Sequence, residues 1–343
     1  MHLSWERLTL NLRTTFRIAH GATDQRQNVL VHLDEGLGEA AAVYYHGESV
    51  QGIVDYLTGV TGSLGDDPLQ VEEILASLPA GSQAARAGLD IALHDLWGKR
   101  LGQPLYRLFG LNPARAPMTS FTIAIDTPEA MAQRAAERDY PIIKIKLGGE
   151  DDEAAVSAIR RVSKARLRVD ANAGWTREQA ARLIPRLAQY DLEFVEQPLP
   201  KGDLDGLRWL HGLHLGLPIF ADENIKTSRD VAAHAGAVDG VVIKLAKSGG
   251  LREALRAIAV ARALDMQVMV GCMIESSVAV TAAAHIAPLC DYADLDAPLL
   301  VSNDPFLGLR YDGARLLLPD GPGLGISSWG GCPGPSATLP RQT

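Results

Sequence analysis

The stretch Ile142–Asp170, IIKIKLGGEDDEAAVSAIRRVSKARLRVD, begins with a short apolar run, continues through an Ala- and Arg-rich segment and ends with a second such run. This order is typical of a strand, a helix and a second strand, and it recurs about every 25 residues from residue 116 onward. Eight βα repeats over roughly 200 residues are what a closed parallel barrel requires. The sequence therefore predicts an α/β fold built on a (β/α)8 TIM-type barrel. An open doubly wound sheet has the same local pattern and is the alternative. The runs are Thr119–Ile125, Ile142–Leu147, Leu167–Asp170, Phe194–Glu196, Ile219–Asp222, Gly240–Lys244, Gln267–Val270 and Ala293–Asp296.

The first third of the chain has a different pattern. Met1–Leu12 and Asn28–Leu33 alternate as antiparallel strands do, and helical periodicity dominates from Val50 to Gly110. The polar segment Arg13–Gln27 between the strands is interpreted as a mobile loop. We therefore predict an N-terminal α+β capping domain over residues 1–115, completed by part of 312–328, and a barrel catalytic domain over 116–311. The Gly- and Pro-rich residues 329–343 are predicted to form a disordered tail.

Composition limits the classes of function. The 343 residues include 33 Lys and Arg against 41 Asp and Glu, and the formal net charge of −8 argues against nucleic acid or a membrane as a partner. No apolar run is long enough to span a bilayer, and the N-terminus lacks the apolar core of a secretory signal. Cys272, Cys290 and Cys332 form neither a disulfide framework nor a metal-binding pair. These features predict a cytoplasmic protein that acts on a small molecule.

Three acidic residues end consecutive barrel runs, where chemistry gathers in this fold. They are Asp170, Glu196 and Asp222. Taken singly, each could be a helix N-cap or a loop residue. Together at the mouth of one barrel they would repel one another strongly, and a divalent cation would remove that repulsion. Three carboxylates without a His or Cys set suit a hard octahedral ion, so we predict a Mg²⁺ site.

Lysines flank this acidic set along the chain. Lys144 and Lys146 are two residues apart on one strand and point the same way, whereas Lys244 ends the sixth run and Lys247 follows it. A lone lysine at a strand end is usually a solvated charge. Here a second ammonium and a cation would lower a lysine pKa from about 10.4 toward the working pH. Two lysines on opposite sides of the ion could then move a proton at the carbon next to a carboxylate, through a metal-stabilised enediolate.

The chain resembles the muconate-lactonising subgroup of the enolase superfamily over nearly its whole length. The helix Ala87–Lys99 followed by Gly102–Leu105 also looks like a signature of that subgroup. The resemblance implies Mg²⁺ ligands at the three acidic positions and acid/base roles for Lys146 and Lys244, with Lys144 tuning Lys146. It also implies that the N-terminal domain closes over the barrel mouth, that Thr14–Gln27 helps to select the substrate, and that the protein forms a homo-oligomer, as family members often do. The motifs that carry it are Lys144-Ile145-Lys146, Asp170-Ala171-Asn172, Glu196-Gln197-Pro198, Ala221-Asp222-Glu223 and Ile243–Gly250.

The eighth run separates the activities of the subgroup. Asp294-Leu295-Asp296 resembles the dipeptide epimerases, where an acidic pair holds the free ammonium group of the substrate. Two inward carboxylates beyond those on the metal require a cation, which a muconate or a succinylbenzoate does not carry. The alternative is that one Asp caps the following helix. Gly271–Ser277 also resembles that family, so Met273 and Ile274 are expected to line the pocket.

The side chain of the substrate is less defined by the sequence. In this family an Ala-Glu epimerase binds the distal carboxylate with a basic group of the mobile loop. Arg17 and Arg26 are the candidates here, and each could instead be a solvated charge. Two positions depart from the commoner family pattern, Asn224 in place of Ser and Arg310 in place of Gly. Asn224 adjoins the metal site and could alter the hydrogen bonds around it.

The leading hypothesis is a Mg²⁺-dependent dipeptide epimerase. It would invert the α-carbon of the C-terminal residue of an L-Ala-D/L-Xaa dipeptide by 1,1-proton transfer, with L-Ala-D/L-Glu from peptidoglycan recycling as the first expectation. Other activities of the subgroup, namely N-acylamino acid racemase, o-succinylbenzoate synthase or muconate cycloisomerase, are the alternatives. A non-catalytic binding protein on the same barrel is a hypothesis of another class, and the retained lysines and carboxylates argue against it.

Overall fold

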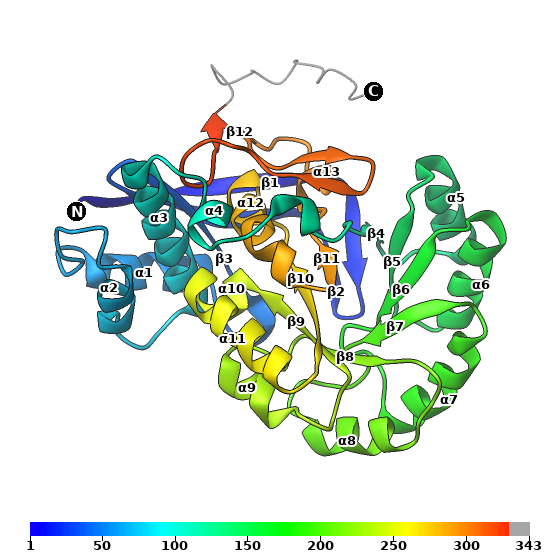
Figure 1. The fold of residues 1–343 in the computed structure, drawn as a ribbon. Coiled ribbons are helices and arrows are strands. Elements are labelled where there is room, and N and C mark those ends of the chain that lie inside the picture. The colour runs from blue at the N-terminus through cyan, green and yellow to red at the C-terminus, as the bar shows by residue number, and fades with distance from the viewer. Residues whose placement is uncertain (329–343) are drawn as a thin grey trace.

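Eight parallel strands form the central sheet of the protein in the computed structural model, which describes residues 1–328 (Figure 1). Each strand pairs with its neighbour in chain order. A bridge between Thr119 and Ala293 joins the chain just before the first barrel strand to the last one, so the sheet closes on itself. The predicted barrel is therefore confirmed, and every predicted run overlaps a strand. The strands are β4 (Phe121–Ile123), β5 (Ile142–Lys146), β6 (Arg166–Asp170), β7 (Leu192–Glu196), β8 (Ile219–Ala221), β9 (Gly240–Lys244), β10 (Gln267–Gly271) and β11 (Tyr292–Asp294).

Helices follow the barrel strands and cover their outer faces. The longer helices turn an apolar stripe to the barrel, as α6 does with Val156 and Ile159, both fully buried. Polar caps fix the starts: in α7 the Thr176 hydroxyl accepts from the Gln179 N–H, and the Gln179 side chain accepts from the Thr176 N–H. The helices are α5 (Pro128–Arg138), α6 (Asp152–Val162), α7 (Arg177–Ala188), α8 (Leu204–Gly212), α9 (Ser228–Ala233), α10 (Leu245–Ser248), α11 (Leu251–Ala263), α12 (Ser277–Ile286), η3 (Ala287–Leu289) and α13 (Ala297–Leu300).

A buried arginine fills the barrel below its mouth. Arg168 lies on β6, two residues before the strand ends, and is 1 % exposed. Its Nε donates to Glu193 Oε2 at 2.6 Å, and its guanidinium carbon lies 5.6 Å and 4.9 Å from the ring centroids of Phe194 and Tyr292. A paired charge packed between aromatic rings closes the interior, so chemistry is confined to the carboxyl ends of the strands.

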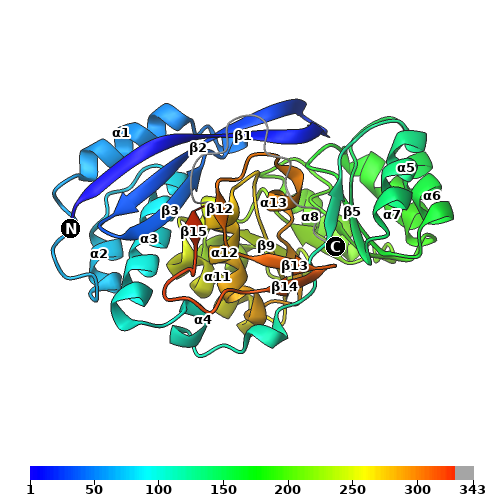
Figure 2. The ribbon, with the colours of Figure 1, turned by 90° about the horizontal axis from the view of Figure 1, so that it is seen from above.

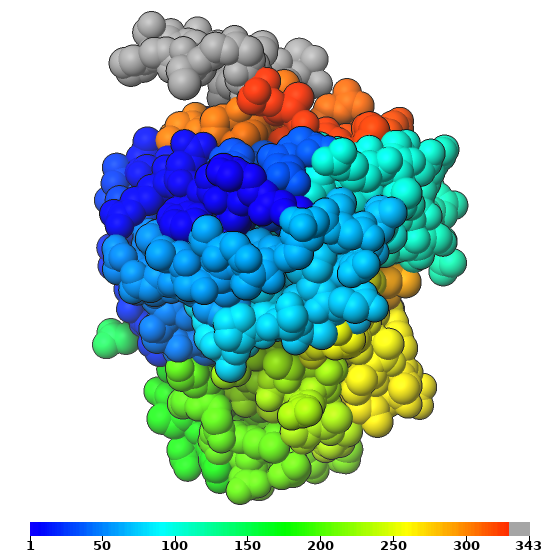
Figure 3. All heavy atoms as spheres, turned by 90° about the vertical axis from the view of Figure 1, so that its left-hand side faces the viewer, coloured from blue at the N-terminus to red at the C-terminus, as the bar shows by residue number. Residues whose placement is uncertain are grey.

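The N-terminal part is a three-stranded antiparallel sheet with helices packed on it (Figure 2). In the space-filling view its blue and cyan residues lie directly against the green and yellow residues of the barrel (Figure 3). None of the helices within residues 1–328 is both long and apolar enough to cross a membrane. The elements are β1 (Leu3–Ile18), β2 (Gly21–Leu33), β3 (Gly36–Ala41), η1 (Tyr44–His46), α1 (Val50–Val60), α2 (Val71–Ser77), α3 (Gln83–Leu101), α4 (Leu105–Leu108) and η2 (Pro113–Arg115).

The segment Arg13–Gln27 is not a loop, so that prediction is wrong. β1 continues to Ile18 and β2 begins at Gly21, and the two strands pair almost to their ends across a register shift between Asn11 and Phe16. Most side chains of this ribbon are exposed or only half-buried. A two-stranded ribbon that is exposed to solvent on both faces has no alternation of apolar and polar residues. The sequence of Arg13–Gln27 therefore did not indicate strands.

The tip of this hairpin rests on the barrel mouth (Figures 1 and 2). The Ile125 N–H donates to the Arg17 carbonyl at 3.0 Å. The Ala19 methyl lies against Gly148 and Gly174, where an added Cβ would come within 2.6 Å and 3.0 Å of it. Two glycines at the ends of neighbouring βα connections therefore make room for the hairpin.

Two buried carboxylates join the N-terminal part to the barrel. Asp90 of α3 accepts from the Leu251 N–H at 2.6 Å and from the Arg252 N–H at 3.2 Å, at the start of α11. Glu39 of β3 accepts from the Ser276 N–H at 3.0 Å and from the Ser276 hydroxyl at 2.6 Å, at the start of α12. The first N–H groups of a helix have no acceptor within the helix, and the helix start carries a partial positive charge. Each carboxylate therefore accepts hydrogen bonds from N–H groups at the start of a barrel helix.

The last described segment returns to the N-terminal part. The Leu105 N–H donates to the Gly323 carbonyl at 3.0 Å, and the Leu324 N–H donates to Asp95 of α3 at 2.8 Å. Its short strands pair β12 with β15 and β13 with β14. The tail predicted over 329–343 lies outside the described residues. The strands are β12 (Phe306–Leu307), β13 (Arg310–Asp312), β14 (Arg315–Leu317) and β15 (Ser327–Ser328).

Close packing of β3 on α3 predicts that Gly38→Ala destabilises the protein. The added Cβ would lie 2.0 Å from the Gly88 carbonyl oxygen, so strand and helix would have to separate. The free energy of unfolding, measured in urea, should fall by about 1–3 kcal/mol. Gly59→Ala in α1 is the control: it meets open space and should leave stability unchanged or slightly higher. Equal stability of the two variants would contradict this packing.

Candidate active site

Three buried carboxylates meet at the mouth of the barrel. Asp170 ends β6, Glu196 ends β7 and Asp222 directly follows β8. One oxygen from each lies within 4.8 Å of the others, and no side chain of the three is more than 1 % exposed. Among residues 1–328 they form the only group of three or more His, Cys, Asp or Glu side chains close enough to share an ion. The strand order alone brings them together, because parallel strands end at one rim.

The chemistry of this acidic triad fits a hard cation. Glu196 Oε1 is buried and has no donor among residues 1–328, and Oε2 meets only the Lys144 ammonium, 2.7 Å away. Burial, followed by the charge of Asp170, raises the pKa of Glu196 well above its ordinary value. An ion among the three carboxylates would use these oxygens and restore the ionised form. Oxygen donors without His or Cys favour Mg²⁺ over zinc.

Two lysines contact opposite ends of the triad. Lys146 Nζ lies 2.6 Å from Asp170 Oδ2, and Lys244 Nζ lies 2.8 Å from Asp222 Oδ2. Their strands, β5 and β9, are separated in the barrel by the three strands that carry or precede the carboxylates. The amines therefore flank the triad from two sides.

The pKa of Lys244 departs from the sequence argument. Burial disfavours its charged form, but Asp222 outweighs burial and raises the pKa well above its ordinary value. We expected a second ammonium and a bound cation to lower a lysine pKa at this site. Without the ion, the pKa of Lys244 has the opposite direction, because the Asp222 carboxylate lies beside its ammonium.

The other two lysines bind carboxylates rather than each other. Lys144 Nζ is fully buried and lies 2.7 Å from Glu196 Oε2, 2.8 Å from Asp294 Oδ2 and 3.1 Å from Asp170 Oδ2. Burial would lower the pKa of Lys144, but these carboxylates raise it, so it stays charged. Lys247 Nζ binds the Asp222 carboxylate and carbonyl and donates to the Val242 carbonyl at 3.1 Å.

The second acidic pair lies next to the first. Asp294 accepts from the Ser120 hydroxyl at 2.7 Å and from Lys144 at 2.8 Å, so the protein itself supplies one cation for the pair. Asp296 accepts from the Thr122 N–H at 2.6 Å. It precedes α13 but makes no side-chain capping bond, so capping of that helix does not explain it. Burial and the charge of Asp294 raise the pKa of Asp296 to about 7.

The segment between β10 and α12 faces the N-terminal part. Met273 and Ile274 are half-buried there. The Ile274 carbonyl accepts from Asn28 Nδ2 at 3.0 Å, and the Tyr45 hydroxyl lies 3.9 Å from Met273 Sδ. Sequence reasoning missed Asn28 and Tyr45, because their partners lie more than 200 residues away and no motif marks them.

The structure separates the two arginine candidates. Arg17 is exposed near the hairpin tip. Arg26 is half-buried on β2, with its guanidinium carbon 5.2 Å from the ring centroid of Tyr44. Neither arginine forms an ion pair with any carboxylate of residues 1–328. Arg26 lies two residues before Asn28 on the same strand, so both side chains point to the same face.

Of the two departures from the family pattern, one reaches the triad. Asn224 Oδ1 accepts from Gln197 Nε2 at 3.0 Å, and Gln197 Oε1 accepts from the Asp222 N–H at 2.8 Å. Asn224 thus fixes the glutamine that orients the Asp222 backbone. Arg310 is exposed at the start of β13, away from this chain of contacts.

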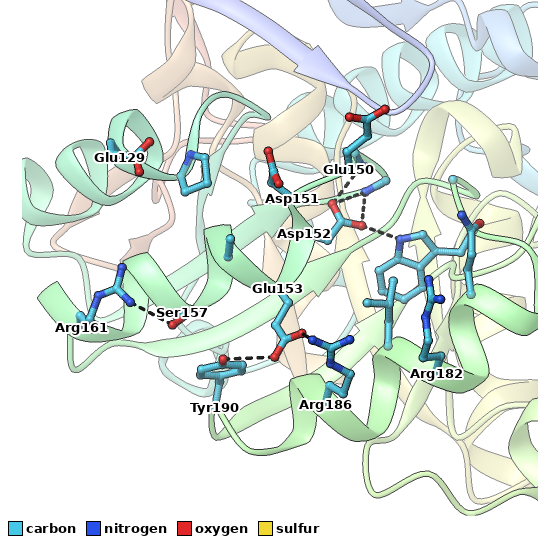
Figure 4. Close-up of a pocket in the computed structure, with 18 residues that line it drawn as sticks. Glu129, Glu150, Asp151, Asp152, Glu153, Ser157, Arg161, Arg182, Arg186 and Tyr190 are labelled. Atoms are coloured by element: carbon cyan, nitrogen blue, oxygen red, sulfur yellow. Dashed lines mark hydrogen bonds and ion pairs between the residues drawn. The ribbon is translucent and has the colours of Figure 1, made fainter.

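A separate cavity of about 880 Å³ lies outside the barrel axis, along α6 and α7 (Figure 4). Some of its polar groups are paired with one another: Asp152 accepts from Trp175 Nε1 at 2.6 Å, and Glu153 binds Arg186. None of the predicted site residues lines it. The triad and its lysines, rather than this cavity, are therefore the candidate active site.

Known proteins match nearly the whole chain. The family described as mandelate racemase/muconate lactonizing enzyme, N-terminal domain, matches residues 6–110, and the family described as enolase C-terminal domain-like matches residues 127–328. The L-Ala-D/L-Glu epimerase of Bacteroides thetaiotaomicron is 41 % identical over 327 residues, which cover 92 % of this chain and 85 % of that protein.

Solved structures of dipeptide epimerases are also similar to this chain over nearly its whole length. The substrate-liganded L-Ala-D/L-Glu epimerase of Bacillus subtilis has a TM-score of 0.89 at 32 % identity, covering 96 % of this chain and 98 % of that one. The dipeptide epimerase of Enterococcus faecalis V583, complexed with Mg and L-Leu-L-Tyr, has a TM-score of 0.87 at 33 % identity, covering 95 % and 99 %. The protein is therefore an isomerase that belongs to the mandelate racemase/muconate lactonizing enzyme family of the enolase superfamily, and it is most like the dipeptide epimerases.

Proposed function

We propose that the protein is a Mg²⁺-dependent dipeptide epimerase that inverts the α-carbon of the C-terminal residue of an L-Ala-D/L-Xaa dipeptide. The observation that carries the proposal is the position of Lys146 and Lys244 at opposite ends of one acidic triad. Amines on two faces of a carbon can remove a proton from one face and return one to the other. The dipeptide complexes of similar proteins support this substrate class.

Asp170, Glu196 and Asp222 would hold the ion. Glu196 Oε1, which has no donor among the described residues, and the Mg complex of the Enterococcus relative support this assignment. When bound, Mg²⁺ supplies a Lewis acid that holds the substrate carboxylate and stabilises the negative charge that develops as the α C–H bond breaks.

The lysines carry the proton. A carboxylate shared with a cation stabilises an ammonium less, so sharing Asp222 lowers the pKa of Lys244 from its raised value. One lysine, as the neutral amine, takes the α-proton from one face of the substrate. The other, as the ammonium, gives a proton to the opposite face, and the exchange leaves their roles reversed. Lys144 stays charged among its carboxylates and adds positive charge beside the triad.

The remaining groups would bind the two ends of the dipeptide. Asp296, ionised above a pKa of about 7, would hold the free ammonium group. Arg26 shares a strand face with Asn28, whose amide contacts the Ile274 carbonyl beside the mouth, so it is better placed than Arg17 to meet a distal carboxylate. L-Ala-D/L-Glu is therefore the first expectation for the substrate.

Removal of either lysine should stop epimerisation, but the remaining lysine should still exchange a proton on its own face of the α-carbon. We expect Lys146→Gln and Lys244→Gln each to lower turnover by about 10²–10⁴-fold. In D₂O each variant should still exchange the α-hydrogen of one enantiomer, and the two variants should prefer opposite enantiomers. Deuterium incorporation read by mass spectrometry measures both effects, with the exposed Lys164→Gln as control. Exchange of the same enantiomer by both variants would contradict the two-sided arrangement.

Asp296→Asn should weaken binding of substrates that carry an ammonium group. Loss of one charge-assisted hydrogen bond should raise KM for dipeptides about 10–100-fold, whereas KM for N-acetylated dipeptides should not change. In the wild type, KM for dipeptides should fall as pH rises through 7, because the Asp296 carboxyl ionises there, and the variant should lose this dependence.

The exposed Asp312→Asn serves as the control for this charge change. Unchanged dipeptide KM in Asp296→Asn would contradict the ammonium-binding role. Faster wild-type turnover of N-acylated amino acids than of dipeptides would favour the N-acylamino acid racemase activity instead.

Arg26→Leu should change side-chain preference. We expect kcat/KM for L-Ala-D/L-Glu to fall about 10–100-fold, while L-Ala-L-Val is unaffected, because only the former has a distal carboxylate. Arg17→Leu is the matched control and should change neither value. A loss confined to the Arg17 variant would reverse the assignment.

A further inference from the structure

Buried hydrogen-bond acceptors without donors are concentrated beside the triad. Five buried side-chain atoms of the described chain accept no hydrogen bond, and four of them belong to Asn172, Glu196 and Glu223. One of these four, Glu196 Oε2, still forms an ion pair with Lys144 at 2.7 Å. Asn172 follows β6 by two residues, and Glu223 directly follows Asp222. They are only 5 % and 7 % exposed, yet Asn172 Oδ1 and Glu223 Oε2 have no protein donor within residues 1–328. A buried acceptor left without a donor destabilises the folded state, so this cluster is set for a ligand that donates.

The orientation of Asn172 is fixed by its contacts. Its Nδ2 lies 3.3 Å from Asp170 Oδ2 and 3.2 Å from Glu223 Oε1. A flipped amide would place its oxygen against two carboxylates, so the free oxygen must face away from them. The backbone is held as well: Asn172 has a φ of +44°, and its N–H donates to Asp170 Oδ1 at 2.8 Å. Asparagine is one of the few residues that tolerate this conformation.

Glu223 is fixed from the other side of the mouth. Its carbonyl lies 2.9 Å from His46 Nε2, on the N-terminal part, while its carboxylate meets Asn172. The pair therefore bridges the connections after β6 and β8, on either side of the strand that carries Glu196. His46 thus holds the Glu223 backbone and Asn172 holds one carboxylate oxygen, which leaves Glu223 Oε2 without a donor among residues 1–328.

Acceptors that lack donors are suited to a water molecule that can only donate hydrogen bonds. A free water molecule both donates and accepts, whereas a water whose oxygen is bound to a cation can only donate. Mg²⁺ gives up its hydration water reluctantly and keeps several molecules in most protein sites. Three carboxylates leave room for such water in an octahedral shell.

We propose that Asn172 and Glu223 form an outer ring of the metal site, in which they accept hydrogen bonds from water of the ion's hydration shell and so set the affinity for Mg²⁺. The inference rests on the proposed function, because it requires Mg²⁺ at the triad. It adds two residues that touch neither the ion nor the substrate. Outer groups of this kind change metal affinity about 10–100-fold in other proteins.

Calorimetric titration with Mg²⁺, without substrate, tests the proposal. Asn172→Gly and Glu223→Gln should each raise the Mg²⁺ dissociation constant by about 10–100-fold. Glycine tolerates the positive φ of residue 172. Because Asn172→Gly changes no charge, its effect reports the loss of a water acceptor alone, whereas Glu223→Gln also removes a charge. The double variant should lose less than the product of the two effects, because the residues contact each other.

Glu275→Gln is the matched control. Glu275 is another buried carboxyl on the rim, 4 % exposed, and it accepts from the Met273 N–H at 3.1 Å away from the triad. Its variant should bind Mg²⁺ within twofold of the wild type. Thermal unfolding without metal should verify that each variant is folded before titration.

Two results would overturn the inference, and they are distinguishable. If the wild type binds Mg²⁺ and Asn172→Gly binds it equally well, the pair has only a structural role while the proposed function stands. If the wild type binds no Mg²⁺ at millimolar concentration, both the inference and the proposed function fail.

Discussion

The repulsion among three carboxylates buried within 4.8 Å of one another is the constraint around which the rest of the mouth is arranged. Such charges cannot share a dry site unless positive charge is placed among them. The chain provides four ammonium groups for this purpose, each in contact with at least one acidic residue. Glu196 Oε1 nevertheless has no donor in the described chain, and Oε2 meets only Lys144, so one buried acceptor is left open where a cation would bind. The three buried carboxylates therefore destabilise the folded protein without an ion, while the same carboxylates are the groups that would bind it.

The fold makes this arrangement possible by holding the charges rigidly. The carboxylates stand at the ends of strands whose hydrogen bonds close into a barrel, and Arg168 with its aromatic neighbours fills the space beneath them. From above, Asp90 and Glu39 tie the N-terminal part to the starts of two barrel helices. The same sheet sends a hairpin across the mouth, so the groups expected to contact the substrate side chain and the groups expected to move the proton come from two structural layers.

Much of this follows from the sequence, for a physical reason. A parallel barrel repeats one local pattern eight times and places the ends of all strands at one rim, so Asp170 and Asp222 could be brought together without any knowledge of long-range contacts. The outer part of the hairpin, Arg13–Gln27, could not be predicted, because a ribbon exposed on both faces lacks the alternation that marks a strand. The contacts of Tyr45, and the three carboxylates that bind Lys144, depend on tertiary packing that no local pattern encodes. The contact of Lys244 with Asp222 at 2.8 Å, which raises the lysine pKa in the absence of an ion, likewise depends on tertiary packing.

Anomalous diffraction from crystals of this protein grown with Mn²⁺ tests the central claim most directly. The account predicts one strong peak in contact with an oxygen from each of Asp170, Glu196 and Asp222, with the Nζ atoms of Lys146 and Lys244 on opposite sides of it. A peak bound elsewhere, no peak at the triad, or both amines on one side of the ion would contradict it.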